Sequence, residues 1–246
     1  MPKLELAVMS LRYSSWSIRP YLALAHAGVD FDIRTADLPE VARQASTGSI
    51  VHADAAAVGL DKRRELGSVT GLFPVLWVDG EPIHESLAIC EWLAESWPDV
   101  HLWPRPTRDR AMARSFSSEM ATGFSNLRTH MGCHVFARVP GFTPDDATRA
   151  EIDRVFDIWR TCLGRSGGPF LFGDFGIIDC MYFPVVTRFR TYCVPLPDDL
   201  EKYATAMESS APVLSWRKLA AVAPAIPAYD EHILSLGGNP DAEAPR

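Results

Sequence analysis

The chain has 246 residues, of which 47% are hydrophobic and 22% are charged, and its formal net charge is −7. This is the composition of a globular protein with room for one or two domains. An acidic chain without runs of lysine or arginine is a poor candidate for binding nucleic acid or an anionic membrane. No apolar run approaches the roughly 20 residues of a membrane span. No secretory signal is recognisable at the start, so a cytoplasmic protein is expected.

The cysteines are five in number and widely spaced: Cys90, Cys133, Cys162, Cys180 and Cys193. None forms a C-x-x-C pair, so neither a zinc site nor a dithiol redox motif is supported. Most of them lie among apolar neighbours, as buried thiols do. A reducing compartment and no bound metal are therefore expected.

The first hundred residues mix strand and helix signals. Alternating or β-branched runs predict strands, the dipeptide Asp79-Gly80 predicts a hairpin turn, and helical spacing follows the hairpin. The predicted strands are 4–8, 31–34, 74–78 and 81–84, with helices over 21–25 and 86–97. The segment 36–70 is variable, with a short helix expected over 60–66.

Three prolines in residues 98–106 predict a linker, and beyond it the pattern becomes helical. Predicted helices cover 107–131, 143–163, 177–192, 198–209 and 211–222. We therefore expect an α/β domain over 1–97, a linker over 98–106, an all-α domain over 107–236 and a loose tail over 237–246.

Three serines, Ser14, Ser15 and Ser17, lie where the first strand hands over to the first helix. A helix start exposes unpaired N–H groups and the positive end of the helix dipole. A hydroxyl there can hold an anion or keep a thiolate ionised. Taken alone, one serine of the cluster would more simply be an N-cap.

Three further signals follow in order. Gly71-Leu72-Phe73-Pro74 opens a strand, Glu85-Ser86 begins a helix after the hairpin, and Gly173-Asp174-Phe175-Gly176 leads to Asp179 in an apolar helix. Each has a plain structural reading. Pro74 can simply begin an edge strand, and Glu85-Ser86 can simply cap a helix.

Together these signals resemble the cytosolic glutathione S-transferase family, over nearly the whole chain except 36–70 and the tail. The resemblance implies a thioredoxin-like N-terminal domain, an all-helical C-terminal domain and a homodimer active in detoxification. The serine cluster looks like the Ser-Ser-Cys motif of the zeta class, which includes maleylacetoacetate isomerases, with Trp16 in place of cysteine.

The resemblance also implies a glutathione site. Pro74 would follow a cis peptide bond, Phe73 would pair with the cysteinyl backbone of glutathione, and Glu85 and Ser86 would hold its γ-glutamyl group. Trp16 would lie beside them. Lowering a thiol pKa of about 8.5 by about two requires roughly 2.7 kcal/mol of thiolate stabilisation, which a hydroxyl at a helix start can supply.

The activating hydroxyl would be that of Ser14 or Ser15, with Ser14 narrowly preferred and Tyr13 a minor candidate. Arg19 is expected to form a structural ion pair. A second-substrate pocket between the domains would be lined by residues of the first loop and of helix 107–131, namely Leu11, Arg12, Thr122, Ser125 and Asn126. Met131 and Phe183 are further candidates for its wall.

Three departures from the family pattern limit this reading. Trp16 replaces the zeta cysteine, Gly176 replaces a Ser or Thr N-cap, and Leu72-Phe73 replaces the commoner Lys-Val. The expected reaction is attack of the glutathione thiolate on a hydrophobic electrophile. Isomerisation, ether cleavage or dehalogenation, and a non-catalytic glutathione- or ligand-binding role remain alternatives, because fold does not decide function.

Overall fold

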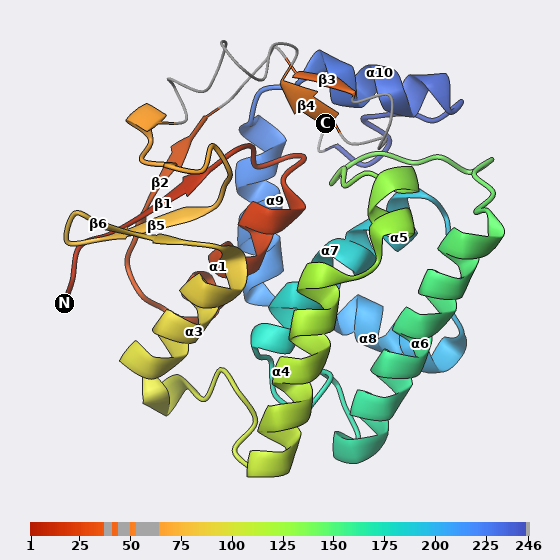
Figure 1. Ribbon diagram of the computed structural model, residues 1–246. Coiled ribbons are helices and arrows are strands. Elements are labelled where there is room, and N and C mark those ends of the chain that lie inside the picture. The colour runs from red at the N-terminus through yellow and green to blue at the C-terminus, as the bar shows by residue number, and fades with distance from the viewer. Residues whose placement is uncertain (37–40, 44–49, 53–63, 245–246) are drawn as a thin grey trace.

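The computed structural model describes residues 1–36, 41–43, 50–52 and 64–244, and divides them into a small sheet domain and a helical domain (Figure 1). The larger sheet has the strand order β2-β1-β5-β6, formed by β1 (Leu4–Val8), β2 (Asp32–Thr35), β5 (Val75–Val78) and β6 (Glu81–His84). The pair β1–β2 is parallel and the other two pairs are antiparallel. The strand predictions for 4–8 and 81–84 are confirmed at both ends.

Helix α1 (Ser15–Ala27) is enclosed on several sides. It contacts α3 (Ser86–Ser96) within its own domain, and α7 (Ile177–Thr191) and α9 (Ala211–Val222) of the helical domain. Figure 1 shows α1 beside α3, with the sheet on one side and α7 on the other. Residues 17–24 are consequently all buried, including the charged Arg19.

The segment between β2 and β5 contains a second pairing, the antiparallel strands β3 (Val41–Arg43) and β4 (Ile50–His52). The short helix expected over 60–66 falls largely outside the described residues. The linker begins with a 3-10 helix, η1 (Pro98–Val100), and then buries Leu102 and Trp103. The amide of Ile177 donates to the carbonyl of Leu102 at 2.9 Å, so the linker is packed against the start of α7.

The helical domain contains α4 (Thr107–Thr122), α5 (Ser125–His130), α6 (Asp146–Ser166), α7, α8 (Asp198–Ser209), α9 and α10 (Pro227–Ser235). The predictions for 198–209 and 211–222 are confirmed at both ends. The helix expected over 107–131 is instead broken after Thr122. Gly123 is extended, Phe124 has a positive φ of 59°, and the guanidinium of Arg128 binds the carbonyls of Met120, Ala121 and Gly123. These carbonyls have no partner within a terminating helix, and Arg128 supplies one.

The end of the chain is not a loose tail. Asn239 exchanges two backbone hydrogen bonds with Arg138, the carboxylate of Asp241 pairs with Arg12, and Glu243 pairs with Arg138. The prediction failed because the partners of these polar residues lie far away in sequence. Among the helices of the described ranges, none is both long and apolar enough to cross a lipid bilayer.

Candidate functional site

The register of the sheet brings the three N-terminal motifs to one edge. Ala7 pairs with Val75, and Val75 pairs with His84. The chain therefore leaves β1 toward the serine cluster at the same edge where it enters β5 from Phe73-Pro74 and leaves β6 for Glu85-Ser86. Phe73 also packs in one apolar cluster with Tyr13. Phe73 and Ser86, which follow Ser14 by 59 and 72 residues in sequence, thus lie at the same end of the sheet as Ser14.

Ser14 is the N-cap of α1. Its Oγ accepts a hydrogen bond from the amide of Ser17 at 3.3 Å and lies 2.8 Å from the Ser17 hydroxyl. Ser17 Oγ also accepts from the amide of Met9 at 3.4 Å. If the Ser17 hydroxyl donates to Ser14, the proton of Ser14 is free for a ligand. The capping role is therefore observed, and it leaves room for a second role.

Ser15 has a different partner. Its Oγ accepts a hydrogen bond at 3.3 Å from Nη2 of Arg188, on α7 of the helical domain. Arg188 is buried, and its other donors reach the carbonyls of Met131 at 2.7 Å and Pro184 at 3.3 Å. The two neighbouring serines thus face different surroundings, one its own helix and the other a buried cation.

Arg19 does not pair with any carboxylate among the described residues. Its Nε donates to the carbonyl of Met181 at 3.3 Å, and Nη1 and Nη2 are buried without a partner. Burial, reinforced by Arg188 and Arg128, lowers the pKa of Arg19 to about 9. Its guanidinium lies 4.1 Å from the centre of the Trp16 ring, which also faces Arg128 at 5.2 Å.

Tyr13 is held by the C-terminal helix. Its hydroxyl donates to Asp230 Oδ1 at 2.9 Å and accepts from the amide of Ile226 at 3.2 Å. His134 lies 2.9 Å from the same carboxylate oxygen, and its Nδ1 accepts from the amide of Phe136. Burial raises the pKa of Tyr13 well above its ordinary value. The Tyr13 hydroxyl therefore links the loop before α1 to the helical domain. Because both of its hydrogen bonds are made there, it is a poor candidate for activating a thiol.

The remaining glutathione-motif residues have distinctive backbones. The Phe73–Pro74 peptide bond is cis, as the resemblance implies. Glu85 has a φ of 70°, a region that non-glycine residues rarely adopt and that is concentrated at functional sites. Ser86 follows as the first residue of α3, buried, and its hydroxyl makes no hydrogen bond with another described residue. The amide and hydroxyl of Ser86 at a helix start suit a carboxylate.

The residues predicted for a second-substrate pocket have unequal surroundings. Leu11 and Arg12 are buried in the loop before α1, and the guanidinium of Arg12 is paired with Asp241. Thr122 bonds the Ser118 carbonyl of its own helix, and Ser125 is exposed. The side-chain amide of Asn126 donates to Glu151 on α6 at 2.8 Å, whereas Arg128 of the same helix faces Trp16.

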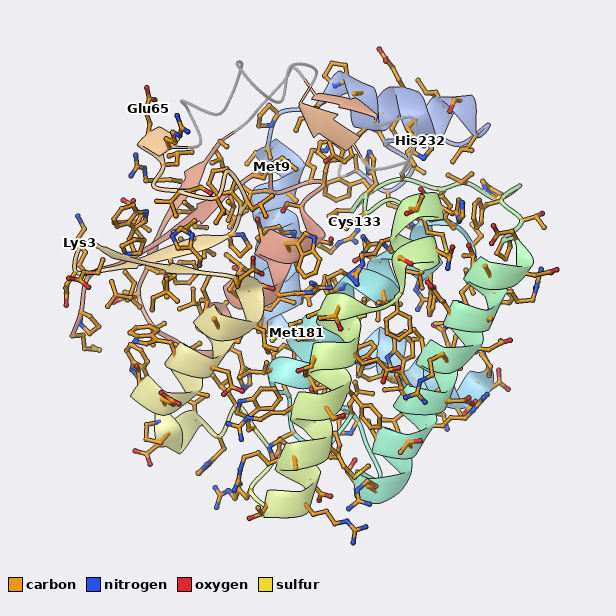
Figure 2. The ribbon with its side chains drawn as sticks, viewed as in Figure 1. Lys3, Met9, Glu65, Cys133, Met181 and His232 are labelled. Atoms are coloured by element: carbon orange, nitrogen blue, oxygen red, sulfur yellow. The ribbon has the colours of Figure 1, made fainter. Side chains whose placement is uncertain are left out.

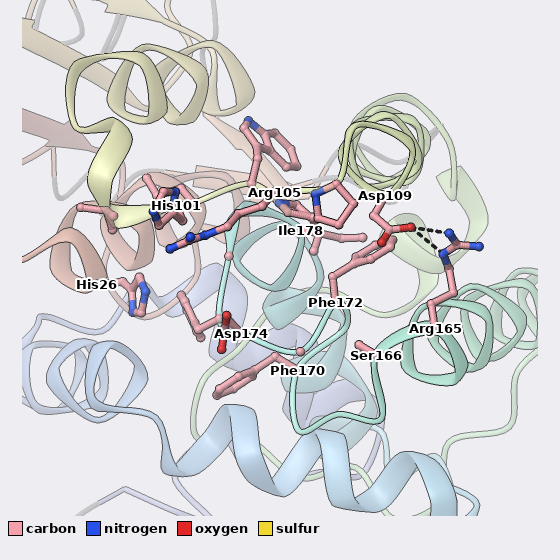
Figure 3. Close-up of a pocket in the computed structure, with 18 of the residues that line it drawn as sticks. His26, His101, Arg105, Asp109, Arg165, Ser166, Phe170, Phe172, Asp174 and Ile178 are labelled. Carbon is pink, nitrogen blue, oxygen red and sulfur yellow. Dashed lines mark hydrogen bonds and ion pairs between the residues drawn. The ribbon is translucent and has the colours of Figure 1, made fainter.

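A separate cavity of about 750 Å³ lies at the other end of α1, and none of the predicted site residues lines it (Figure 3). Its wall includes His26, the linker around Arg105, and the Asp109–Arg165 ion pair. Burial lowers the pKa of His26. Within the described part of the chain, no group of three or more His, Cys, Asp or Glu side chains is arranged to hold a metal ion.

Sequence reasoning missed Arg128 and Arg188 as neighbours of the site. Arg188 follows the apolar residues 180–186 of α7 and alternates with Arg190, so the signal is a pair of arginines at the end of an apolar helix, of which Arg188 is buried. Arg128 carries no comparable signal, because the helix break that positions it was not predicted.

Comparison with protein families and curated proteins agrees with this geometry. The N-terminal domain family of glutathione S-transferases matches residues 13–96, and the C-terminal domain family matches residues 135–218. A probable maleylacetoacetate isomerase of Caenorhabditis elegans is 35% identical over 113 residues, which are 46% of this chain and 44% of that protein. The match therefore spans less than half of that relative. A second probable maleylacetoacetate isomerase, from Drosophila melanogaster, is 28% identical over 207 residues, which are 82% of this chain and 76% of that protein.

Solved structures share the fold. A glutathione transferase homologue from Burkholderia, with bound glutathione, has a TM-score of 0.64 at 22% identity, covering 89% of this chain and 98% of that one. A maleylacetoacetate isomerase from Anaeromyxobacter dehalogenans, with dicarboxyethyl glutathione and citrate in its active site, has a TM-score of 0.59 at 22% identity and covers 100% and 99% of the two chains.

Proposed function

The chain belongs to the glutathione S-transferase family, and from that premise we propose that it binds glutathione at the sheet edge and activates its thiol with a serine hydroxyl. Phe73 pairs with the cysteinyl backbone of glutathione, Glu85 and Ser86 hold the γ-glutamyl group, and Trp16 flanks them. Ser14 or Ser15 donates to the sulfur. The thiolate then attacks a hydrophobic electrophile bound between the domains.

The observation that carries this proposal is the common edge shared by the three motifs. Ala7, Val75 and His84 are paired at the ends of their strands, so the segments that lead to Ser14, Phe73-Pro74 and Ser86 begin at the same end of the sheet. A hydroxyl at the start of α1 and an amide at the start of α3 both favour anions, the first a thiolate and the second a carboxylate.

Glutathione-dependent cis–trans isomerisation is the second candidate. The curated relatives named maleylacetoacetate isomerase favour it, and so does the Ser14-Ser15 pair. The replacement of the motif cysteine by Trp16 argues for a different substrate. Conjugation, isomerisation and ether or halide displacement all use the same thiolate, so the choice among them is a choice of electrophile. A carrier that binds glutathione without turnover is the non-catalytic alternative.

Calorimetry with glutathione and S-methylglutathione tests the binding step, and a panel of halide, ether and cis-enone electrophiles tests the chemistry. We expect binding of both ligands and turnover of at least one electrophile class. A Ser86→Ala variant should weaken both ligands alike, because it removes a contact to the γ-glutamyl group and leaves the thiol untouched. Failure of the wild-type chain to bind either ligand would sink the proposal. We also propose that the chain forms a homodimer, and light scattering tests this by the molar mass in solution.

A further inference from the structure

Three arginines from three helices converge beside Ser15. Arg188 of α7 donates to the Ser15 hydroxyl, while Arg19 of α1 and Arg128 of α5 both lie over the ring of Trp16, 4.1 and 5.2 Å from its centre. Figure 2 labels Cys133 and Met181 in this region between α1 and the helical domain. The carbonyls of Met131 and Met181 bind Arg188 and Arg19 there.

The cluster lacks a counter-charge in the described part of the chain. None of the three arginines forms an ion pair with a described carboxylate, and Glu151 attracts Arg128 only through space. Arg188 and Arg128 lie close enough to Arg19 to lower its pKa. The thiol of Cys133 faces Arg19 and Arg188, and the Cys90 thiol and the Tyr182 hydroxyl also face Arg19. Burial raises the pKa of all three groups, which keeps them neutral. Like charges buried together are costly unless an anion joins them.

We propose that Arg188, supported by Arg19, stabilises the thiolate of bound glutathione and orients the Ser15 hydroxyl toward it. This inference rests on the proposed function. Because Arg188 Nη2 donates to Ser15 Oγ, the hydroxyl proton of Ser15 is left to point toward the sulfur. Arg188 is thus a positioning residue that acts from the helical domain on a group bound by the sheet domain.

Burial favours a thiolate over a substrate carboxylate as the anion. Arg19 is 0% exposed and Arg188 is 4% exposed, so a substrate group has little access to either guanidinium. Ser15 is 6% exposed and accepts a hydrogen bond from Arg188, so it connects the cluster to the start of α1. A buried guanidinium group that no ligand contacts still attracts a nearby thiolate, because the electrostatic interaction is strong where the dielectric constant is low. The start of α1 adds its own positive potential at the same place.

The test follows the thiolate absorbance of bound glutathione against pH. The complex with S-methylglutathione is subtracted, which cancels Cys133 and the tyrosines. In Arg188→Met the pKa of the bound thiol should rise by about 1, which is a tenfold decrease in its acid dissociation constant. Arg188→Lys retains the charge and should restore part of the effect. S-methylglutathione should bind all variants equally, since it has no thiol to ionise.

Arg190→Met is the matched control. Arg190 lies two residues along the same helix but is paired with Glu201 and Glu208, so its loss should leave the thiol pKa unchanged. If Arg188→Met does not fold, Ser15→Ala carries the test, and there too the thiol pKa should rise. Glutathione that binds with an unchanged thiol pKa in these variants overturns the inference and leaves the proposed function standing. A KM increase confined to carboxylate-bearing electrophiles would instead assign the cluster to the second substrate.

Discussion

Ser14 and Ser15 are adjacent in sequence, yet their hydroxyls have different hydrogen-bond partners. Ser14 caps its own helix, and Ser15 is bonded by an arginine from another domain. The sequence predicts that a hydroxyl of this pair is functional, because both stand at a helix start. It cannot assign the roles, because the partner of Ser15 lies 173 residues away.

Paired substitutions at Ser14 separate capping from thiol activation. Replacing an N-cap serine by alanine costs about 1 kcal/mol of stability, and replacing it by glycine costs only a few tenths. Both remove the hydroxyl. We therefore expect Ser14→Ala to have a lower free energy of unfolding than Ser14→Gly, measured with urea. If Ser14 also activates the thiol, both variants lose catalytic rate equally. A rate loss that tracks stability would leave Ser14 with the cap alone.

At the scale of elements, Gly176 explains a departure from the family pattern. It precedes α7, where a Ser or Thr was expected, and a Cβ at this position would lie 2.7 Å from the carbonyl oxygen of Leu102. Its amide still donates to Asp179 Oδ2 at 2.9 Å, so the carboxylate half of the capping arrangement is present. The close approach of the linker, which sequence reasoning could not see, is what the glycine permits.

Two glycine-to-alanine changes provide a test of that close approach. Gly176→Ala forces the linker away from α7 and should lower the free energy of unfolding by about 1–3 kcal/mol, the usual cost of overpacking. Gly164 lies inside α6 with open space around it. Gly164→Ala should raise stability by about 0.5–1 kcal/mol, because alanine loses less backbone freedom in a helix. Equal effects from the two changes would contradict the role assigned to the linker contact.

Helix positions were predictable where local signals agree and were not where distant contacts decide. The prolines and polar residues around 198–209 and 211–222 mark both ends of α8 and α9. The break after Thr122 depends on Arg128 reaching back to the end of α4, and α10 depends on Tyr13 and His134 binding Asp230. Neither the break after Thr122 nor the position of α10 can be predicted from the hydrophobic periodicity of the local sequence.

At the scale of the whole molecule, the C-terminal segment closes the structure. Asn239, Asp241 and Glu243 bind residues of the loop before α1 and of the segment before α6. Deleting residues 238–246 should therefore lower the thermal midpoint and leave Arg12 without its carboxylate. Calorimetry of the truncated chain checks this, with Asp241→Asn as a smaller version of the same loss. A midpoint equal to that of the full chain would restore the description of a loose tail.

Residues 12–15, which end at the first residue of α1, have consequences for how such proteins diverge. Arg12 is bound by Asp241, Tyr13 by Asp230 and Ser15 by Arg188, so each of these side chains is held by the other domain. The two halves are therefore not interchangeable parts. A chimera that inherits its sheet domain from this chain and its helices from a relative would lose the partners of Arg12, Tyr13 and Ser15. Recombination at the linker would therefore require compensating substitutions in both domains. We expect the two domains of this protein to be inherited together in evolution.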